Sequence, residues 1–197
     1  MPTVAPNTSV PSVSPWNLPN AITTLRILLV PLFIWFLFEA ADKGAWQRWV
    51  ALVLFILAIS TDGVDGAIAR KRGLVTNLGK ILDPIADKAL IGGALVALSI
   101  LGELPWWATV AILARELGIT AYRFIVIRKR VVEASGGGKL KTILQSITVG
   151  LFLSPFDVLL GDWVFWVEDW LLLITVAITL YTGAQYLWAA AKAKVTV

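Results

Sequence analysis

The chain has 197 residues and a formal net charge of +4, and apolar residues make up 58% of it against 15% charged residues. This composition excludes an ordinary soluble globule. The absence of cysteine and histidine excludes a disulfide framework, a thiolate metal site and catalysis by an imidazole.

The first 15 residues, MPTVAPNTSVPSVSP, carry no charge and are rich in proline, serine and threonine, which predicts a disordered tail over residues 1–15. No basic segment precedes the first apolar run, so we expect no cleaved signal peptide. Residues 16–197 are expected to form a single domain.

Six apolar segments of about membrane-spanning length follow the tail, since a helix needs about 20 residues to cross about 30 Å of hydrocarbon. They are expected at 21–38, 46–70, 82–101, 106–127, 140–155 and 163–191. The third is expected to begin with Asp83 as N-cap and Pro84 as the first helical residue. The predicted fold class is an all-α polytopic membrane protein with six transmembrane helices.

Charged and aromatic residues indicate how these helices are oriented. Eleven basic residues lie in or at the edges of the connections after the second and fourth segments and after the sixth, whereas the opposite side holds only Lys43 and Arg48. The positive-inside rule therefore predicts cytoplasmic N and C termini in a plasma-membrane protein. Tryptophans gather on the opposite side, at the depth of lipid head groups. They are Trp46, Trp49, Trp106, Trp107, Trp163, Trp166 and Trp170.

Four aspartates interrupt the apolar pattern between the second and third segments, in STDGVDGAIARKRGLVTNLGKILDPIADKAL at residues 60–90. Asp62 and Asp65 are three residues apart and Asp83 and Asp87 four, so each pair shares one face of its helix. Counting about 20 residues from the far end of each segment places all four in the inner third of the bilayer. The neighbouring glycines and alanines let the helices approach closely.

Four carboxylates at this depth are too costly for a structural role alone. One aspartate near the bilayer centre costs about 2.5–3.5 kcal/mol, so four cost roughly 10 kcal/mol, less a discount for shallow depth. Two divalent cations would cancel the four charges, and ligation by carboxylates alone favours Mg²⁺ or Mn²⁺. We predict a two-metal site of the kind used in phosphoryl transfer. The alternative is four capped, solvated aspartates at helix ends.

Eight residues of this stretch resemble the signature of the CDP-alcohol phosphotransferases, D-x₂-D-G-x₂-A-R-x₈-G-x₃-D-x₃-D. The resemblance implies a six-helix membrane enzyme that joins an alcohol to a CDP-linked lipid, releases CMP and uses Mg²⁺ or Mn²⁺. Three further stretches, NLPNAITTLRILLVPLF, LARELG and GGGKLKTILQ, resemble the phosphatidylglycerophosphate synthase branch of the family. The signature residues are Asp62, Asp65, Gly66, Ala69, Arg70, Gly79, Asp83 and Asp87.

The resemblance also implies individual roles. Asp62, Asp65 and Asp83 would ligate metal, and Asp87 would contact the second metal and act as general base for the acceptor hydroxyl. The implied partners are CDP-diacylglycerol, glycerol 3-phosphate and the lipid bilayer, without nucleic acid, and a homodimer is left open. The residues implied to bind CDP-diacylglycerol are Asn20, Thr23, Asp62, Gly66, Ala69, Arg70, Thr76 and Gly79.

Basic residues in and after the fourth segment point to a site for the acceptor phosphate. Arg115 and Arg123 are eight residues apart, about 12 Å along a helix and on a similar face, and Lys139 and Lys141 follow a run of glycines. We predict that some of these four bind the phosphate. Arg115 is not expected to pair with Glu116, because adjacent residues on a helix do not face each other.

The expected reaction transfers a phosphatidyl group from CDP-diacylglycerol to glycerol 3-phosphate and gives phosphatidylglycerophosphate and CMP. Cardiolipin synthases and phosphatidylinositol-phosphate synthases of the same family share much of the pattern, so these acceptors remain alternatives. A divalent-cation transporter is an alternative of a different class. The outer halves of the second and third segments offer only apolar and small residues, which argues against a transporter. Lys88, beside Asp87, is expected either to snorkel toward the membrane surface or to balance charge.

Overall fold

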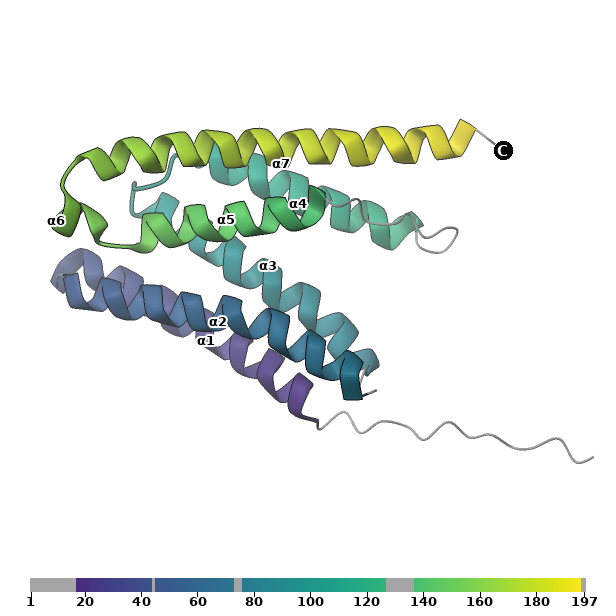
Figure 1. The fold of residues 1–197 in the computed structure, drawn as a ribbon, viewed down its shortest axis with the longest axis horizontal. Helices are drawn as coiled ribbons and strands as arrows, with labels where there is room; N and C mark the ends of the chain where they lie inside the picture. The colour runs from purple at the N-terminus through teal and green to yellow at the C-terminus, as the bar shows by residue number, and fades with distance from the viewer. Residues whose placement is uncertain (1–16, 44, 73–75, 127–136, 196–197) are drawn as a thin grey trace, which may run out of the picture.

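The computed structural model describes residues 17–43, 45–72, 76–126 and 137–195, and all regular secondary structure in these ranges is helical. Five helices are each longer than 20 residues, α5 is shorter and α6 is a single short turn (Figure 1). The helices are α1 (Leu18–Lys43), α2 (Ala45–Arg72), α3 (Asn77–Ile100), α4 (Trp106–Val126), α5 (Gly137–Leu153), α6 (Phe156–Leu160) and α7 (Trp163–Val195).

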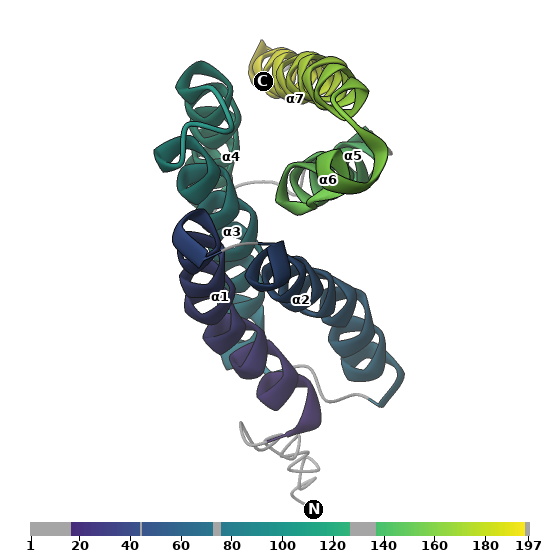
Figure 2. The same ribbon diagram turned by 90° about the vertical axis from the view of Figure 1, so that its left-hand side faces the viewer.

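The long helices form one bundle with two distinct ends. α1 packs against α2 and α3, while α7 packs against α4 and α5 (Figures 1 and 2). The start of α1, the end of α7 and the junction of α2 with α3 share one end of the bundle, here called the motif end. The short helix α6 marks the opposite end, here called the α6 end.

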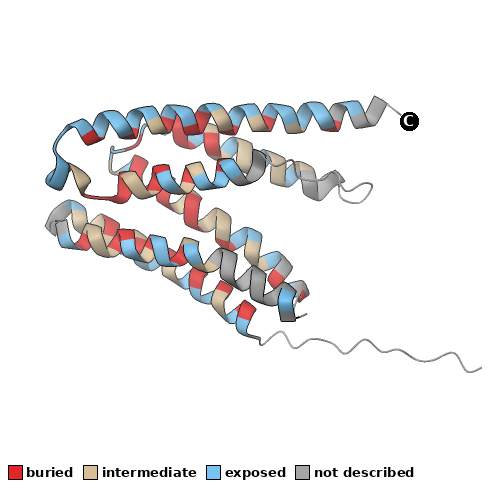
Figure 3. Cartoon of the chain, viewed as in Figure 1, coloured by how far each residue is buried: buried red, intermediate tan, exposed pale blue. Residues whose placement is uncertain are grey.

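Apolar side chains fill the bundle and also cover much of its surface. The buried core runs through all the long helices (Figure 3), and Phe33 of α1 meets Phe55 of α2 edge-to-face with ring centroids 6.0 Å apart. Many large apolar side chains nevertheless point outward, among them Trp35, Ile56 and Trp166. A surface of this kind suits hydrocarbon better than water, because exposed apolar area is costly in water.

Two helices are long and apolar enough to cross a membrane by themselves. They contain the stretches Leu18–Ala41 in α1 and Trp163–Ala190 in α7. Shorter apolar stretches occupy Trp46–Thr61 in α2 and Leu140–Leu153 in α5. The all-helical fold class predicted from the sequence is confirmed in the described residues.

The expected segments match the six longer helices, with one correction at the start of α3. The helix begins at Asn77, so the prediction that Asp83 caps it and Pro84 opens it was wrong. Thr76 is the N-cap, and its hydroxyl accepts a hydrogen bond from the amide of Gly79 at 3.0 Å. Threonine is a favourable N-cap, and Pro84 is accommodated inside the helix, where it removes one backbone donor.

Helix α6 was not predicted, because five residues are too few to show a helical period. It lies between Pro155, its N-cap, and Gly161, whose φ of 89° is accessible mainly to glycine. This turn reverses the chain between α5 and α7 and brings the starts of α6 and α7 close to the end of α5.

Candidate active site

The four aspartates of the motif lie at the motif end of α2 and α3. Asp62 and Asp65 belong to the last three turns of α2, and Asp83 and Asp87 to the first three turns of α3, with only residues 73–76 between the helices. The sequence prediction that they share one end of a helical hairpin is consistent with this arrangement. The side chains of several predicted site residues lie outside the described part of the structure: Asp62, Asp65, Gly66, Ala69, Arg70, Arg123 and Lys139.

Helix α1 supplies a hydrogen bond to one of the described carboxylates. The hydroxyl of Thr23 donates to Oδ1 of Asp83 at 3.0 Å, and Thr23 is only 1% exposed. Arg26, three residues later and on the same face of α1, is also 1% exposed. Thr23 was predicted as a nucleotide contact, and the structure gives it a further role, because its hydrogen bond fixes the orientation of a predicted metal ligand.

Three other residues predicted for the nucleotide site contact one another between α1 and α3. The amide Nδ2 of Asn20 donates to the hydroxyl of Thr76 at 2.9 Å, and the same hydroxyl accepts from the backbone of Gly79. A Cβ added to Gly79 would lie 2.7 Å from Oδ1 of Asn20. The position therefore requires glycine, because a side chain would collide with a buried amide that is already hydrogen-bonded.

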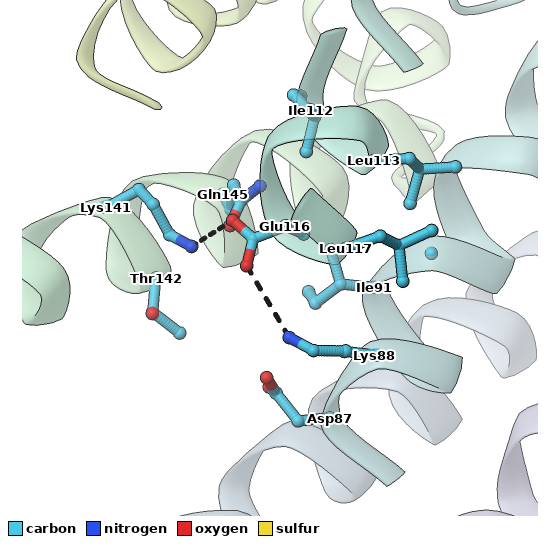
Figure 4. A pocket seen from close by; sticks show the side chains of 11 residues that line it. Asp87, Lys88, Ile91, Ile112, Leu113, Glu116, Leu117, Lys141, Thr142 and Gln145 are labelled. Carbon is cyan, nitrogen blue, oxygen red and sulfur yellow. Dashed lines mark hydrogen bonds and ion pairs between the residues drawn. The ribbon is translucent and has the colours of Figure 1, made fainter. Parts of the chain in front are cut away.

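Asp87 faces a second group of polar side chains across a small cavity of about 50 Å³ (Figure 4). The polar lining includes Asp87 and Lys88 of α3, Glu116 of α4, and Lys141 and Gln145 of α5. One water needs only about 10–15 Å³ of such space, so the cavity has room for a small polar group. Three consecutive helices, α3, α4 and α5, therefore converge beside the aspartate predicted to be the general base.

Glu116 is the centre of a charge cluster drawn from these three helices. Its Oε1 accepts hydrogen bonds from Nζ of Lys141 and from Nη1 of Arg115, the latter at 3.0 Å, and its Oε2 lies 3.7 Å from Nζ of Lys88 (Figure 4). Three cations around one carboxylate leave an excess of positive charge, so this part of the site attracts anions. The ion pair between Lys88 and Glu116 favours the charge-balancing role of Lys88 over snorkelling.

The expectation that Arg115 and Glu116 do not pair was wrong. The Cα–Cβ bonds of these neighbouring residues point in different directions. The long side chain of Arg115 nevertheless reaches Glu116, with Nη1 3.0 Å from Oε1. Arg115 is held on its other side by α7, where Nη2 donates to the hydroxyl of Thr182 at 3.1 Å and the side chain lies against Gly183. Arg115 therefore braces α4 against α7 and does not itself line the cavity.

Gln145 is a site residue that the sequence reasoning did not single out. It is 3% exposed, lines the cavity, and its Nε2 has no hydrogen-bond partner among the described residues. A buried donor without a partner costs about 1–3 kcal/mol, which favours a bound polar group at this point. The available signal was its spacing, four residues after Lys141, which places both polar groups on one face of α5.

The donor set at the motif suits divalent cations. The described side chains contain no cluster of three acidic residues, but they include only Asp83 and Asp87 of the four aspartates. Carboxylate oxygens are the ligands that Mg²⁺ and Mn²⁺ prefer, and Thr23 orients one of them. Asp62, Asp65, Asp83 and Asp87 would hold such ions, which would stabilise the charge of a diphosphate.

Comparison with known proteins identifies the family. The family model for CDP-alcohol phosphatidyltransferases matches residues 16–188. A probable phosphatidylglycerophosphate synthase of Mycobacterium tuberculosis is 50% identical over 141 residues, which cover 72% of this chain and 68% of that protein. A CDP-diacylglycerol–glycerol-3-phosphate 3-phosphatidyltransferase of Bacillus subtilis is 38% identical over 193 residues, covering 90% and 98%.

A protein of the same name from Shigella flexneri is 31% identical over 181 residues, which cover 89% of this chain and 95% of that protein. The family match includes the whole aspartate motif, the α1 residues that contact it and the charge cluster around Glu116. The chain therefore belongs to the CDP-alcohol phosphatidyltransferase family.

Proposed function

We propose that this protein transfers the phosphatidyl group of CDP-diacylglycerol to glycerol 3-phosphate and releases CMP. Membership of the family supplies the reaction class, and relatives named for this donor and acceptor are 31–50% identical. The observation that carries the proposal within the molecule is the cavity in which Asp87 faces Lys141 and Gln145. It offers a base and phosphate-binding donors side by side, as a phosphorylated alcohol requires.

The donor substrate is assigned to the side of the motif that faces α1. Asn20, Thr76 and Gly79 form a closely packed, hydrogen-bonded group there, which supports a binding surface made partly of backbone. Backbone amides and a glycine without a side chain allow close approach of a nucleotide diphosphate. Gly66, Ala69 and Arg70 on α2 complete this proposed site.

Asp87 is assigned the proton of the acceptor hydroxyl. The chain has no histidine, so a carboxylate beside the acceptor cavity is the available base. Asp62, Asp65, Asp83 and Asp87 would hold two Mg²⁺ or Mn²⁺ ions, which would neutralise the diphosphate and make the attacking hydroxyl easier to deprotonate. The hydroxyl oxygen then displaces CMP at the phosphorus that carries the diacylglycerol.

The acceptor phosphate is assigned to the cation cluster across the cavity. Glycerol 3-phosphate brings a charge near −2, which needs donors separated from the four aspartates. Lys141 and the free Nε2 of Gln145 are the described donors that fit, and Arg123 and Lys139 remain proposed partners. Arg115 acts indirectly, by holding Glu116 and therefore Lys141 in place.

The protein is proposed to cross the membrane six times, by α1 to α5 and α7, with the motif end in the cytoplasm. Most of the basic residues in the described ranges lie toward this end, in agreement with the positive-inside rule. The tryptophans at the α6 end are mostly exposed, as expected at the opposite interface. Water-soluble glycerol 3-phosphate and CMP would then enter and leave from the cytoplasm.

A cation transporter with the same aspartates is a weaker reading. Between the two ends the bundle is filled with buried apolar side chains, among them Phe55, Ala58, Leu90, Ala94 and Leu98. This packing argues against a path for ions between α2 and α3, because ions do not cross an apolar core without polar groups.

Chelation tests the reaction class. Purified protein in nanodiscs with CDP-diacylglycerol and glycerol 3-phosphate is expected to release CMP, to stop in excess EDTA, and to resume when Mg²⁺ or Mn²⁺ is restored. Full turnover in EDTA would overturn the metal assignment. Metal flux into protein-containing vesicles without CMP release would favour the transporter.

A further inference from the structure

The α6 end contains a second cavity, far from the aspartate motif and unconnected with the proposed reaction. Its volume is about 400 Å³, within the range of about 300–1,000 Å³ typical of small-ligand sites. It is formed where α1 ends, α2 begins, α3 turns into α4, and α5 passes through α6 into α7. Its charged lining residues are Arg48, Glu103, Asp157 and Glu168.

Arg48, the basic residue among the described lining residues, already binds Glu103. Arg48 donates from both terminal nitrogens to the two carboxylate oxygens of Glu103. The same guanidinium donates to the backbone carbonyls of Phe152 and Leu153 at the end of α5, the latter from Nε at 3.3 Å. Arg48 therefore ties the start of α2 and the turn between α3 and α4 to the end of α5. Its charge also attracts Glu168, but its hydrogen bonds in the described residues go to Glu103 and to α5, so neither Glu168 nor Asp157 receives one from it.

Glu168 is the unusual member of the lining. It is 8% exposed, and no hydrogen bond or ion pair joins its carboxylate to any residue in the described ranges. A buried carboxylate is normally paired, because desolvation of an unpaired charge is expensive. Its position on the cavity wall makes the cavity the place from which a partner for this charge would come.

The surrounding charge favours a cationic partner. Near the α6 end the chain carries seven acidic residues and only two basic ones, Lys43 and Arg48, so the local field attracts cations. The acidic residues are Glu39, Asp42, Glu103, Asp157, Asp162, Glu168 and Asp169.

The described residues favour an organic cation over a metal ion. They contain no group of three acidic side chains placed to hold a metal. The remaining lining is largely apolar and includes Phe152, Val158 and Phe165, which suits carbon atoms next to a charged group. Exposed Trp163 and Trp166 at the same end place the cavity at the depth of lipid head groups.

We propose that this cavity binds a primary ammonium group, either of an aminophospholipid head group or of a small free amine, with Glu168 as its hydrogen-bond acceptor. The ammonium donates to the carboxylate of Glu168, Asp157 adds a second negative charge nearby, and the carbon chain of the ligand lies against the apolar wall. A charge-assisted hydrogen bond of this kind changes affinity by about tenfold or more.

The test measures thermal unfolding of the full chain in nanodiscs of phosphatidylglycerol, with phosphatidylethanolamine, phosphatidylcholine or free ethanolamine added in parallel. We expect phosphatidylethanolamine or ethanolamine to raise the unfolding midpoint, and phosphatidylcholine, which has the charge but no N–H donor, to raise it less. A shift by ethanolamine alone identifies the ligand as a free amine, and a shift by the lipid alone identifies a head group.

Glu168→Gln should weaken the apparent amine affinity at least about tenfold, whereas Asp169→Asn, at the exposed neighbouring position outside the cavity lining, should change it much less. The proposal is overturned if neither amine shifts the wild-type midpoint, if phosphatidylcholine acts as strongly, or if the Glu168→Gln protein responds like the wild type. CMP release, measured on the same samples, reports separately on the reaction at the motif end.

Discussion

Asp83 and Asp87 lie one helical turn apart on α3 but have different surroundings. Asp83 accepts a hydrogen bond from Thr23, which holds its carboxylate in one orientation, as a metal ligand requires. Asp87 lines the cavity beside Lys141 and Gln145, where an acceptor hydroxyl would lie. The difference supports different roles for the two residues: Asp83 binds metal, and Asp87 binds metal and also accepts the proton of the acceptor hydroxyl.

Replacing Asp87 by asparagine tests this division. Asparagine keeps the shape of the side chain but removes its charge and basicity, so we expect kcat to fall by about 10²-fold or more. Binding of CDP-diacylglycerol should persist. Initial rates of CMP release, with Asp169→Asn as the exposed control on α7, would measure the effect. Near-normal turnover of the Asp87→Asn protein would exclude Asp87 both as base and as an essential ligand.

Lys141 gives a test of the acceptor site. Loss of a charge-assisted hydrogen bond costs about 1.5–3 kcal/mol, so Lys141→Gln should raise the KM for glycerol 3-phosphate about 10- to 150-fold. The KM for CDP-diacylglycerol should change much less. Lys141→Arg should recover part of the loss, and Lys192→Gln, at an exposed position on α7, should behave as wild type. Equal increases in both KM values would instead indicate a general structural defect.

The contacts of Glu116 could not be predicted from the sequence, whereas the grouping of the four aspartates could. Asp62, Asp65, Asp83 and Asp87 could be grouped in advance, because helical spacing and a short connection bring them to one end of a hairpin. The contact of Glu116 with Lys141 joins residues 25 apart on different helices. It depends on how α4 and α5 pack, which local periodicity does not encode.

At the scale of the elements, the start of α3 matters most for the site. The cap at Thr76 serves two purposes, because the same hydroxyl satisfies the amide of Gly79 and accepts from Asn20 of α1. The sequence predicts the start of the third segment at Asp83-Pro84, because Asp-Pro is a common helix opening. Thr76 itself was singled out only as a nucleotide contact, although threonine before a helical run is an equally good signal.

A pair of glycine variants tests the junction of α1 and α3. In Gly79→Ala the new methyl would lie 2.7 Å from Oδ1 of Asn20, so we expect a loss of about 1–3 kcal/mol of stability and a higher KM for CDP-diacylglycerol. Gly118→Ala on α4 has open space around its added methyl and should be neutral or stabilising by up to about 1 kcal/mol. Thermal unfolding in nanodiscs measures both. If Gly79→Ala matched Gly118→Ala, the close approach of α1 to α3 would not matter to the site.

For the whole molecule, alternating hydrophobic segments and basic connections were enough to predict an all-helical fold and the bounds of most helices to within a few residues. Long apolar runs strongly indicate membrane-spanning helices, since few other kinds of structure contain about 20 consecutive apolar residues. The short α6 and the cavity beside it could not be predicted, because they depend on a five-residue turn between two helices.

Orientation in the membrane can be tested directly because the chain contains no cysteine. Single cysteines at Asp162, between α6 and α7, and at Lys192, near the end of α7, are both at exposed positions. We expect a membrane-impermeant maleimide to label Asp162→Cys in intact spheroplasts and Lys192→Cys only after permeabilisation. The reverse pattern would place the aspartate motif on the outer side and remove its access to cytoplasmic glycerol 3-phosphate.

The choice of acceptor is the central claim, and one measurement addresses it most directly. Purified wild-type protein in nanodiscs with CDP-diacylglycerol and Mg²⁺ is given glycerol 3-phosphate, phosphatidylglycerol or an inositol phosphate, each radiolabelled, and CMP and labelled lipid are counted together. We predict that glycerol 3-phosphate alone supports rapid turnover, with one CMP released for each labelled phosphatidylglycerophosphate formed. Turnover with phosphatidylglycerol or an inositol phosphate, and none with glycerol 3-phosphate, would contradict the assignment.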